Sequence, residues 1–161
     1  MRNREREFVD MVVNWLRGQT FQLYDGTVLS FTLVTVGRYP ERAPGFPVAV
    51  VVPLGPVWEN VVLGAGSRLD RVARRVQVAI EVHYEHIDPE VGLYHMSDIF
   101  NQLVEGLLAR PRVLDEVILR VVDTDYSYAI QDKATDGTPP DLIPDWGYKG
   151  VGVVVLEAEW R

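Results

Sequence analysis

Hydrophobic residues recur along the chain with two different periods, and each period predicts a different element. Residues 3–17 are predicted to form a helix with one apolar face, made by Phe8, Val9, Val12, Val13, Trp15 and Leu16. Charged and polar side chains fill the opposite face of this segment, and Gly18 follows as a helix stop. We therefore expect an N-terminal helix that buries one side.

Period-two alternation marks the predicted strands. Residues 28–36 alternate with apolar or β-branched side chains on both faces, which favours a strand covered on both sides. Residues 76–85 place valines, Ile80 and Tyr84 on one face, while His83 and Glu85 lie on the other. This second pattern predicts a half-buried strand with His83 on its polar face.

Prolines and turn residues interrupt the rest of the chain. Prolines at 40, 44, 47, 53 and 56 reduce this region to two short edge or hairpin strands, 48–52 and 57–63. Residues 88–92 are predicted to form a turn, and Ser97 with Asp98 offers an N-cap for a second helix at about 97–110, before Pro111.

The C-terminal third is predicted to be rich in strands. A β-rich segment covers 116–130, a long polar and proline-rich loop covers 131–149, and a closing strand alternates up to Trp160. Together the elements predict an α+β fold, a single domain over 1–161, with a mainly antiparallel sheet and two helices packed on it.

Composition and charge exclude several classes of protein. The 161 residues include no cysteine, which excludes disulfides, thiolate zinc sites and cysteine nucleophiles. No apolar run is long enough for a membrane span, and the charged start lacks a secretory signal pattern, so a cytoplasmic protein is expected. The net charge of −7 repels phosphate backbones at long range, so specific DNA binding is not expected.

The only histidine cluster is the strongest candidate for a metal or acid–base site. His83, Glu85 and His86 come together at a strand end, and His95 and Asp98 follow. A metal needs three or four converging ligands, and His86 falls on the opposite strand face from His83. The simpler interpretation is that these are solvated residues of a strand end and a turn.

Paired carboxylates are a second candidate for cation binding. Asp123 with Asp125, and Glu157 with Glu159, each share one face of a strand. Solvated strand faces produce such pairs routinely. Neither the glycines at 64 and 66 nor the two lysines match a nucleotide-binding motif, and no serine has a nucleophile context. We predict no catalytic residue, no bound metal and no cofactor.

Large aromatic residues stand where a small monomer seldom carries them. Trp58 lies among prolines, Trp146 and Tyr148 lie in the long polar loop, and Trp160 is next to the chain end. Aromatic residues on loops and termini often dock onto a partner, although each of these could instead pack on its own core. They are candidate residues of a subunit or partner interface.

The order of elements resembles the tail terminator proteins of long-tailed phages and related tail-completion and head–tail joining proteins. The resemblance covers the first helix, the proline-broken strands, the run VQVAIEVHY, SDIFNQLVEGLLAR and EVILRVVDTDYSY, the long loop, and the final GVVVLEAEWR. It implies a structural subunit of the virion tail or neck, assembled in the host cytoplasm. Such a subunit forms a homo-oligomeric ring, typically a hexamer, which caps the tail tube and joins it to the head through neck or connector proteins.

The resemblance brings no catalytic residues, and the negative charge agrees with a ring through which DNA passes without specific binding. Two alternatives from other classes stay open. One is a small metal-dependent enzyme that uses His83, Glu85 and His86, and the other is a monomeric binding module with a pocket covered by 131–149.

Overall fold

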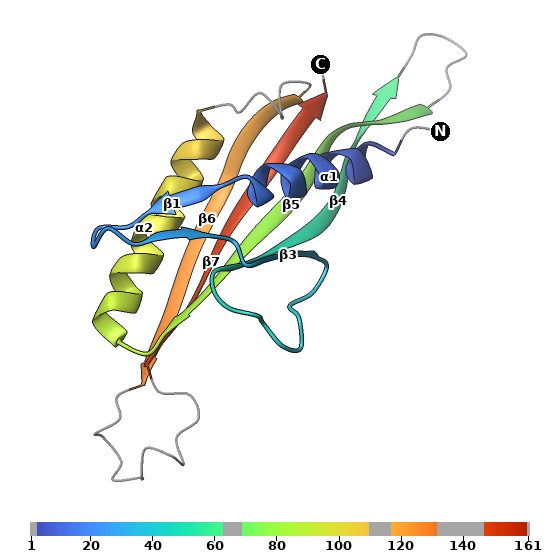
Figure 1. Cartoon of the computed structure of the whole chain (residues 1–161). Coiled ribbons are helices and arrows are strands. Elements are labelled where there is room, and N and C mark those ends of the chain that lie inside the picture. The colour runs from blue at the N-terminus through green and yellow to red at the C-terminus, as the bar shows by residue number, and fades with distance from the viewer. Residues whose placement is uncertain (1–2, 63–68, 110–116, 132–146, 161) are drawn as a thin grey trace.

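The computed structural model describes residues 3–62, 69–109, 117–131 and 147–160, with side chains except those of 56–62, 69–74 and 131. These ranges contain two helices, α1 (Arg4–Arg17) and α2 (Pro89–Leu108). The strands are β1 (Thr20–Gln22), β2 (Val28–Ser30), β3 (Leu33–Val36), β4 (Val48–Val62), β5 (Leu69–His86), β6 (Val117–Gln131) and β7 (Gly147–Trp160) (Figure 1).

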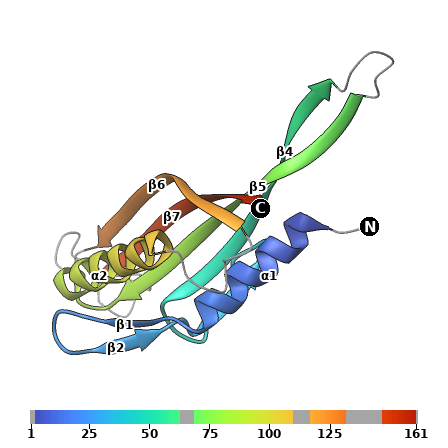
Figure 2. The ribbon, with the colours of Figure 1, turned by 90° about the horizontal axis from the view of Figure 1, so that it is seen from above.

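Five of the strands form one sheet in the order β3-β4-β5-β7-β6, while β1 and β2 form a separate antiparallel pair. The β3–β4 pair is parallel and the other pairs of the large sheet are antiparallel. Both helices lie on the same face of this sheet (Figures 1 and 2). The predicted α+β class with a mainly antiparallel sheet is confirmed, since the β3–β4 pair is the one parallel pair among the described strands.

Helix α1 agrees closely with its prediction. The Asn3 side chain caps it by accepting the Arg6 backbone N–H at 3.1 Å, and Gly18 ends it. Its apolar face is buried, and Phe8, Val12 and Leu16 are fully inaccessible to solvent. These side chains join residues of α2, β5 and β7 in one hydrophobic cluster.

Helix α2 begins at Pro89, eight residues before the predicted start at 97. The true N-cap is Asp88, whose carboxylate accepts the backbone N–H groups of Glu90 and Val91. A proline suits the first helical position, since its missing N–H needs no partner there. The segment 88–92, predicted as a turn, is therefore the first turn of the helix.

Two strand predictions were wrong in their boundaries. The predicted strand 28–36 is divided between β2 and β3, because Thr32 turns away and its N–H donates to the Pro47 carbonyl at 3.0 Å. The predicted pieces 48–52 and 57–63 form the single strand β4, which lies inside the sheet. Irregular pairing at Pro53/Gly55 and Val57/Trp58 accommodates the prolines.

The C-terminal strands fit the expected order. Gln131 still belongs to β6 and Gly147 opens β7, so the predicted loop 131–149 is shorter at both ends, and residues 132–146 lie outside the described ranges. Strands β4 and β5 extend as a two-stranded ribbon beyond the point where β7 stops pairing at Arg75 (Figure 2). The strand order places β3 at one lateral edge of the large sheet and β6 at the other.

Candidate functional site

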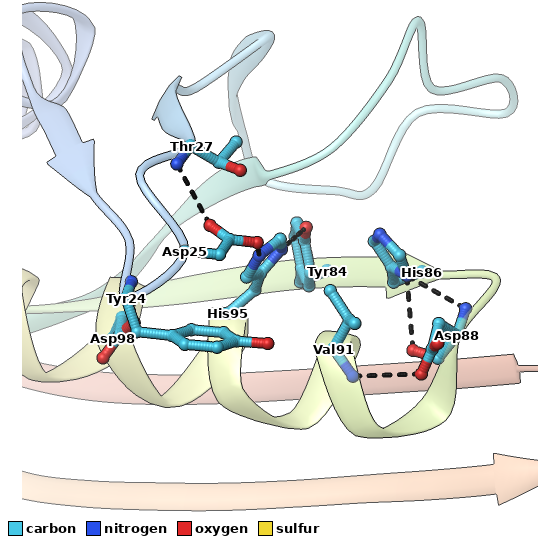
Figure 3. Close-up of polar contacts among 9 residues, drawn as sticks. All are labelled: Tyr24, Asp25, Thr27, Tyr84, His86, Asp88, Val91, His95 and Asp98. Carbon is cyan, nitrogen blue, oxygen red and sulfur yellow. Dashed lines mark hydrogen bonds and ion pairs between the residues drawn. The ribbon is translucent and has the colours of Figure 1, made fainter.

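Three side chains, those of Tyr84, His95 and Asp25, form a continuous line of polar contacts. The Tyr84 hydroxyl lies 2.8 Å from His95 Nδ1, and His95 Nε2 lies 2.7 Å from Asp25 Oδ2 (Figure 3). Tyr84 and His95 are each only 4% exposed. Because both ring nitrogens of His95 have a partner, the buried imidazole is satisfied on both sides.

The three residues come from separate elements. Tyr84 lies near the end of β5, His95 on the second turn of α2, and Asp25 in the turn that joins β1 to β2. Gly26 takes a positive φ of 86° in this turn, and Thr27 N–H donates to Asp25 Oδ1 at 3.0 Å. The site therefore fastens the β1–β2 turn to the main sheet through α2.

Two further contacts hold the same turn. The Asp98 carboxylate on α2 accepts a hydrogen bond from the Tyr24 backbone N–H at 2.9 Å (Figure 3). The Gln102 side chain donates to the Gln22 carbonyl and accepts the Gln22 N–H. Asp98 therefore anchors β1 and does not cap a helix as predicted.

The surroundings shift the pKa values of the two outer groups, Asp25 and Tyr84, in opposite directions. Hydrogen bonds hold the pKa of Asp25 well below its usual range, and the bond from His95 has a larger effect than those from Thr27. Burial, followed by the charge of Asp25, raises the pKa of Tyr84 to about 12. We assign His95 Nε2–H as the donor to the Asp25 carboxylate, since a carboxylate only accepts, and in that tautomer Nδ1 accepts from the Tyr84 hydroxyl. Since Tyr84 and His95 are both shielded from water, we interpret the arrangement as a structural anchor.

The predicted metal candidates do not converge. His83 lies on the sheet face away from the helices, where its ring centroid is 4.6 Å from that of Tyr39. His86 lies on the helix side of the sheet, with its ring centroid 5.4 Å from that of His95. His86 Nδ1 accepts the Asp88 backbone N–H at 2.9 Å. Within the ranges that the structure describes, no group of three or more histidine, aspartate or glutamate residues can hold a metal ion.

The two carboxylate pairs have different surroundings. Glu157 accepts from Gln77 at 2.9 Å and lies 3.5 Å from Arg75, so it belongs to a cross-strand network of β5 and β7. Asp123 and Asp125 are exposed on β6, and each carboxylate accepts the backbone N–H of the next residue. These bonds are local and do not define a cation site.

A cavity of about 460 Å³ opens on the sheet face away from the helices. Tyr39 and Phe46, from the segment between β3 and β4, form one wall. His83, Lys149 and Ser127 are among its other lining residues. Lys149 lies 3.2 Å from Glu85, so the charges at this cavity compensate each other. The predicted cover was 131–149, and residues 132–146 of it lie outside the described ranges.

The predicted aromatic interface is partly wrong. Tyr148 is only 1% exposed and its hydroxyl lies 2.9 Å from that of Tyr126, so Tyr148 is a core residue of β7 and not a docking residue. Trp160 is partly buried, and the Arg4 guanidinium lies 5.9 Å from its ring centroid, as in a cation–π contact. The side chain of Trp58 and all of Trp146 lie outside the described residues.

Sequence reasoning missed the partnership of Asp25, Tyr84 and His95. The stretch Tyr24-Asp25-Gly26-Thr27 predicts a turn, and the alternation places Tyr84 on the apolar face of its strand. No local pattern joins two residues 70 positions apart, as Asp25 and His95 are. The one available signal was that a histidine on the apolar side of a helix requires a buried polar partner.

Comparison with known proteins adds little to this geometry. No family model matches the chain. The chain is 28% identical over 120 residues to the "Aliphatic sulfonates import ATP-binding protein SsuB 2" of Paracoccus denitrificans (strain Pd 1222). The matched segment is 72% of this chain and 45% of that protein, so the chain spans less than half of its relative. Among the described helices, none is long and apolar enough to cross a membrane.

The anchor gives a pH-dependent prediction for Asp25→Asn. Because the folded pKa of Asp25 is lower than the unfolded one, the unfolded chain binds a proton more readily, and acid removes this stabilisation. The variant should melt below the parent at about pH 7, and the difference should shrink from about pH 5 downward. Circular dichroism melts across this range measure it.

Asp10→Asn is the matched control, because Asp10 is exposed on α1. Its melting temperature should follow the parent at every pH. A difference between Asp25→Asn and the parent that stays constant from neutral to acid pH would contradict the proposed charge state of Asp25.

Proposed function

We propose that this protein is a structural, ring-forming subunit of a phage tail or neck, of the tail terminator kind. The observation that supports this most is the lateral order of the sheet, β3-β4-β5-β7-β6, which leaves different strands at its two edges within the described ranges. A closed ring requires two different surfaces on each subunit, because every contact is head-to-tail. The two edges supply such a pair.

The charge of the chain agrees with this proposal. With 23 acidic and 16 basic side chains, a ring of these subunits has a strongly negative field, which keeps DNA from adhering to the wall of a central channel. The proposed partners are therefore other copies of the chain, a tail tube below and neck or connector proteins above. Another head–tail connector role uses the same ring and is a variant of this proposal.

ATP binding is the second candidate, because the name of the matched relative includes it. A phosphate-binding loop of the G-x-x-x-x-G-K-[ST] type requires a lysine directly after glycine. The two lysines of this chain, Lys133 and Lys149, follow Asp132 and Tyr148. The chain therefore lacks the residues that would cradle nucleotide phosphates in this way, and we favour the ring.

The test is the native mass in solution, measured by light scattering behind a size-exclusion column over a wide range of protein and salt concentrations. We expect a discrete assembly of several 18.2 kDa subunits, or a monomer that becomes this assembly on concentration. A strict monomer whose melting temperature rises with Mg²⁺ and ATP would instead support the nucleotide-binding candidate.

A further inference from the structure

The outer edge of β6 is a long unpaired strand edge. In the ranges that the structure describes, β6 pairs with β7 alone, although it runs for 15 residues. Pairing is irregular between Val121 and Asp123, and it is continuous from Asp123 to Gln131. An open edge of this length presents a row of backbone N–H and C=O groups to any added strand.

The side chains along this edge are more apolar than a solvated edge requires. Val122 and Tyr128 are each 51% exposed, and Ile118 and Ile130 are also exposed. The opposite edge resembles it, because Val36 at the end of β3 is 51% exposed and Tyr39 follows it. Both edges therefore offer apolar surface to a partner.

The exposed charges at the two edges differ in net sign, since β6 carries Arg120 beside its two aspartates and the segment after β3 carries Glu41 beside its two arginines. Asp123 and Asp125 are exposed on β6, and their register opposite Val155 and Val153 sets both on the same strand face. At the other edge, Arg38 and Arg42 are exposed in the segment that follows β3. An edge with net negative charge on one side and a segment with net positive charge on the other make the molecule complementary to a second copy of itself, placed side by side.

We propose that a second copy of this chain docks its β3 edge and residues 37–42 against the β6 edge, continuing the sheet from subunit to subunit. The pairing is centred on Asp123–Ile130, where the ladder is regular, with Asp123 and Asp125 facing Arg38 and Arg42 of the neighbouring copy. This inference rests on the proposed ring and identifies the surface that builds it. Each subunit uses both edges once, as the head-to-tail contacts of a ring require.

Pairing of β6 with β6 of another copy is the competing geometry. It would bring the acidic pair of each copy into a single joint and leave Arg38 and Arg42 without a role. Like charges close together weaken strand pairing. A β6–β6 contact also stops at a dimer, since it consumes the same edge on both copies.

Charge reversal tests the proposed joint. In Asp123→Arg/Asp125→Arg the β6 edge becomes basic, and in Arg38→Asp/Arg42→Asp the opposite edge becomes acidic. Each double variant places like charges across the joint, and we expect assembly to weaken on the order of tenfold or more in dissociation constant. An equimolar mixture should recover assembly when the two variants alternate, because each joint then pairs either two unchanged edges or two reversed edges, and both kinds bring opposite charges together.

Matched controls change the same charge elsewhere. Asp10→Arg/Glu105→Arg and Arg6→Asp/Arg17→Asp alter exposed positions on the helices, and their assembly should equal that of the parent. High salt should also weaken the parent assembly, because exposed charges are screened. Native mass by light scattering measures every sample, and melting curves check that each variant is folded.

The outcomes separate the two levels of the proposal. A parent that never assembles overturns the ring itself. A parent that assembles while both reversals leave its mass unchanged overturns the joint and leaves the ring intact. Sensitivity to only one of the two reversals overturns the pairing of Asp123 and Asp125 with Arg38 and Arg42. Loss in each variant with recovery on mixing supports the joint.

Discussion

Phe8→Ala should lower the free energy of unfolding by about 3–5 kcal/mol, the usual cost of removing a fully buried aromatic ring. The Phe8 side chain has no exposed surface, and with Val12 and Leu16 it forms the face of α1 that packs toward the sheet. Removal of the Phe8 ring leaves a cavity that α1 cannot fill without moving. Urea unfolding, monitored by circular dichroism, gives the difference.

Asp10→Ala is the control for this measurement, because Asp10 lies on the exposed side of the same helix. Its unfolding free energy should stay within about 0.5 kcal/mol of the parent. If Phe8→Ala costs no more than Asp10→Ala, α1 does not pack on the sheet as described.

Gly92→Ala should be destabilising by about 2 kcal/mol, although alanine is the better helix former by about 1 kcal/mol. A Cβ atom at Gly92 would overlap the Cβ and Cγ atoms of Tyr148 and crowd His86. Tyr148 cannot move aside easily, since it is 1% exposed and hydrogen-bonded to Tyr126. The close approach of α2 to β7 therefore depends on this glycine.

Gly106→Ala on the same helix is the matched control. Its new Cβ would lie 3.1 Å from Cζ2 of Trp15, a tight contact with the edge of one ring, while the gain in helix propensity acts in the opposite direction. We expect little net change in melting temperature there. Equal effects of Gly92→Ala and Gly106→Ala would contradict the packing of Tyr148 beneath α2.

The sequence was most informative where one periodic pattern decides an element. Helix α1 was predicted from 3 to 17 and runs Arg4–Arg17, because its apolar face, Asn3 cap and Gly18 stop agree. The alternation around Ile80 correctly predicted the inner and outer faces of β5, with His83 facing away from the helices. Local patterns suffice when burial follows one period.

Prediction failed where tertiary contacts override local signals. The prolines at 53 and 56 predicted a broken segment, yet β4 continues through them with bulges because β5 pairs along its length. Asp88 and Pro89 fit a turn and a helix start equally well in sequence, and the contacts of α2 decide for the helix.

The candidate residues show the same limit. His95 was predicted to be solvated, yet it is buried between Tyr84 and Asp25, from elements that are distant in sequence. Tyr148 was predicted to belong to a loop and lies in the core, since the glycines at 92 and 150 leave room for its ring. The charges at the sheet edges acquire meaning only after the strand order is known.

The most direct measurement of the central claim is negative-stain electron microscopy of the concentrated parent protein, with images averaged by class. We predict closed rings of uniform diameter with a central channel, composed of identical subunits in rotational symmetry. Single particles of monomer size at every concentration, or open filaments without closure, would contradict the proposal that this chain is a ring-forming subunit.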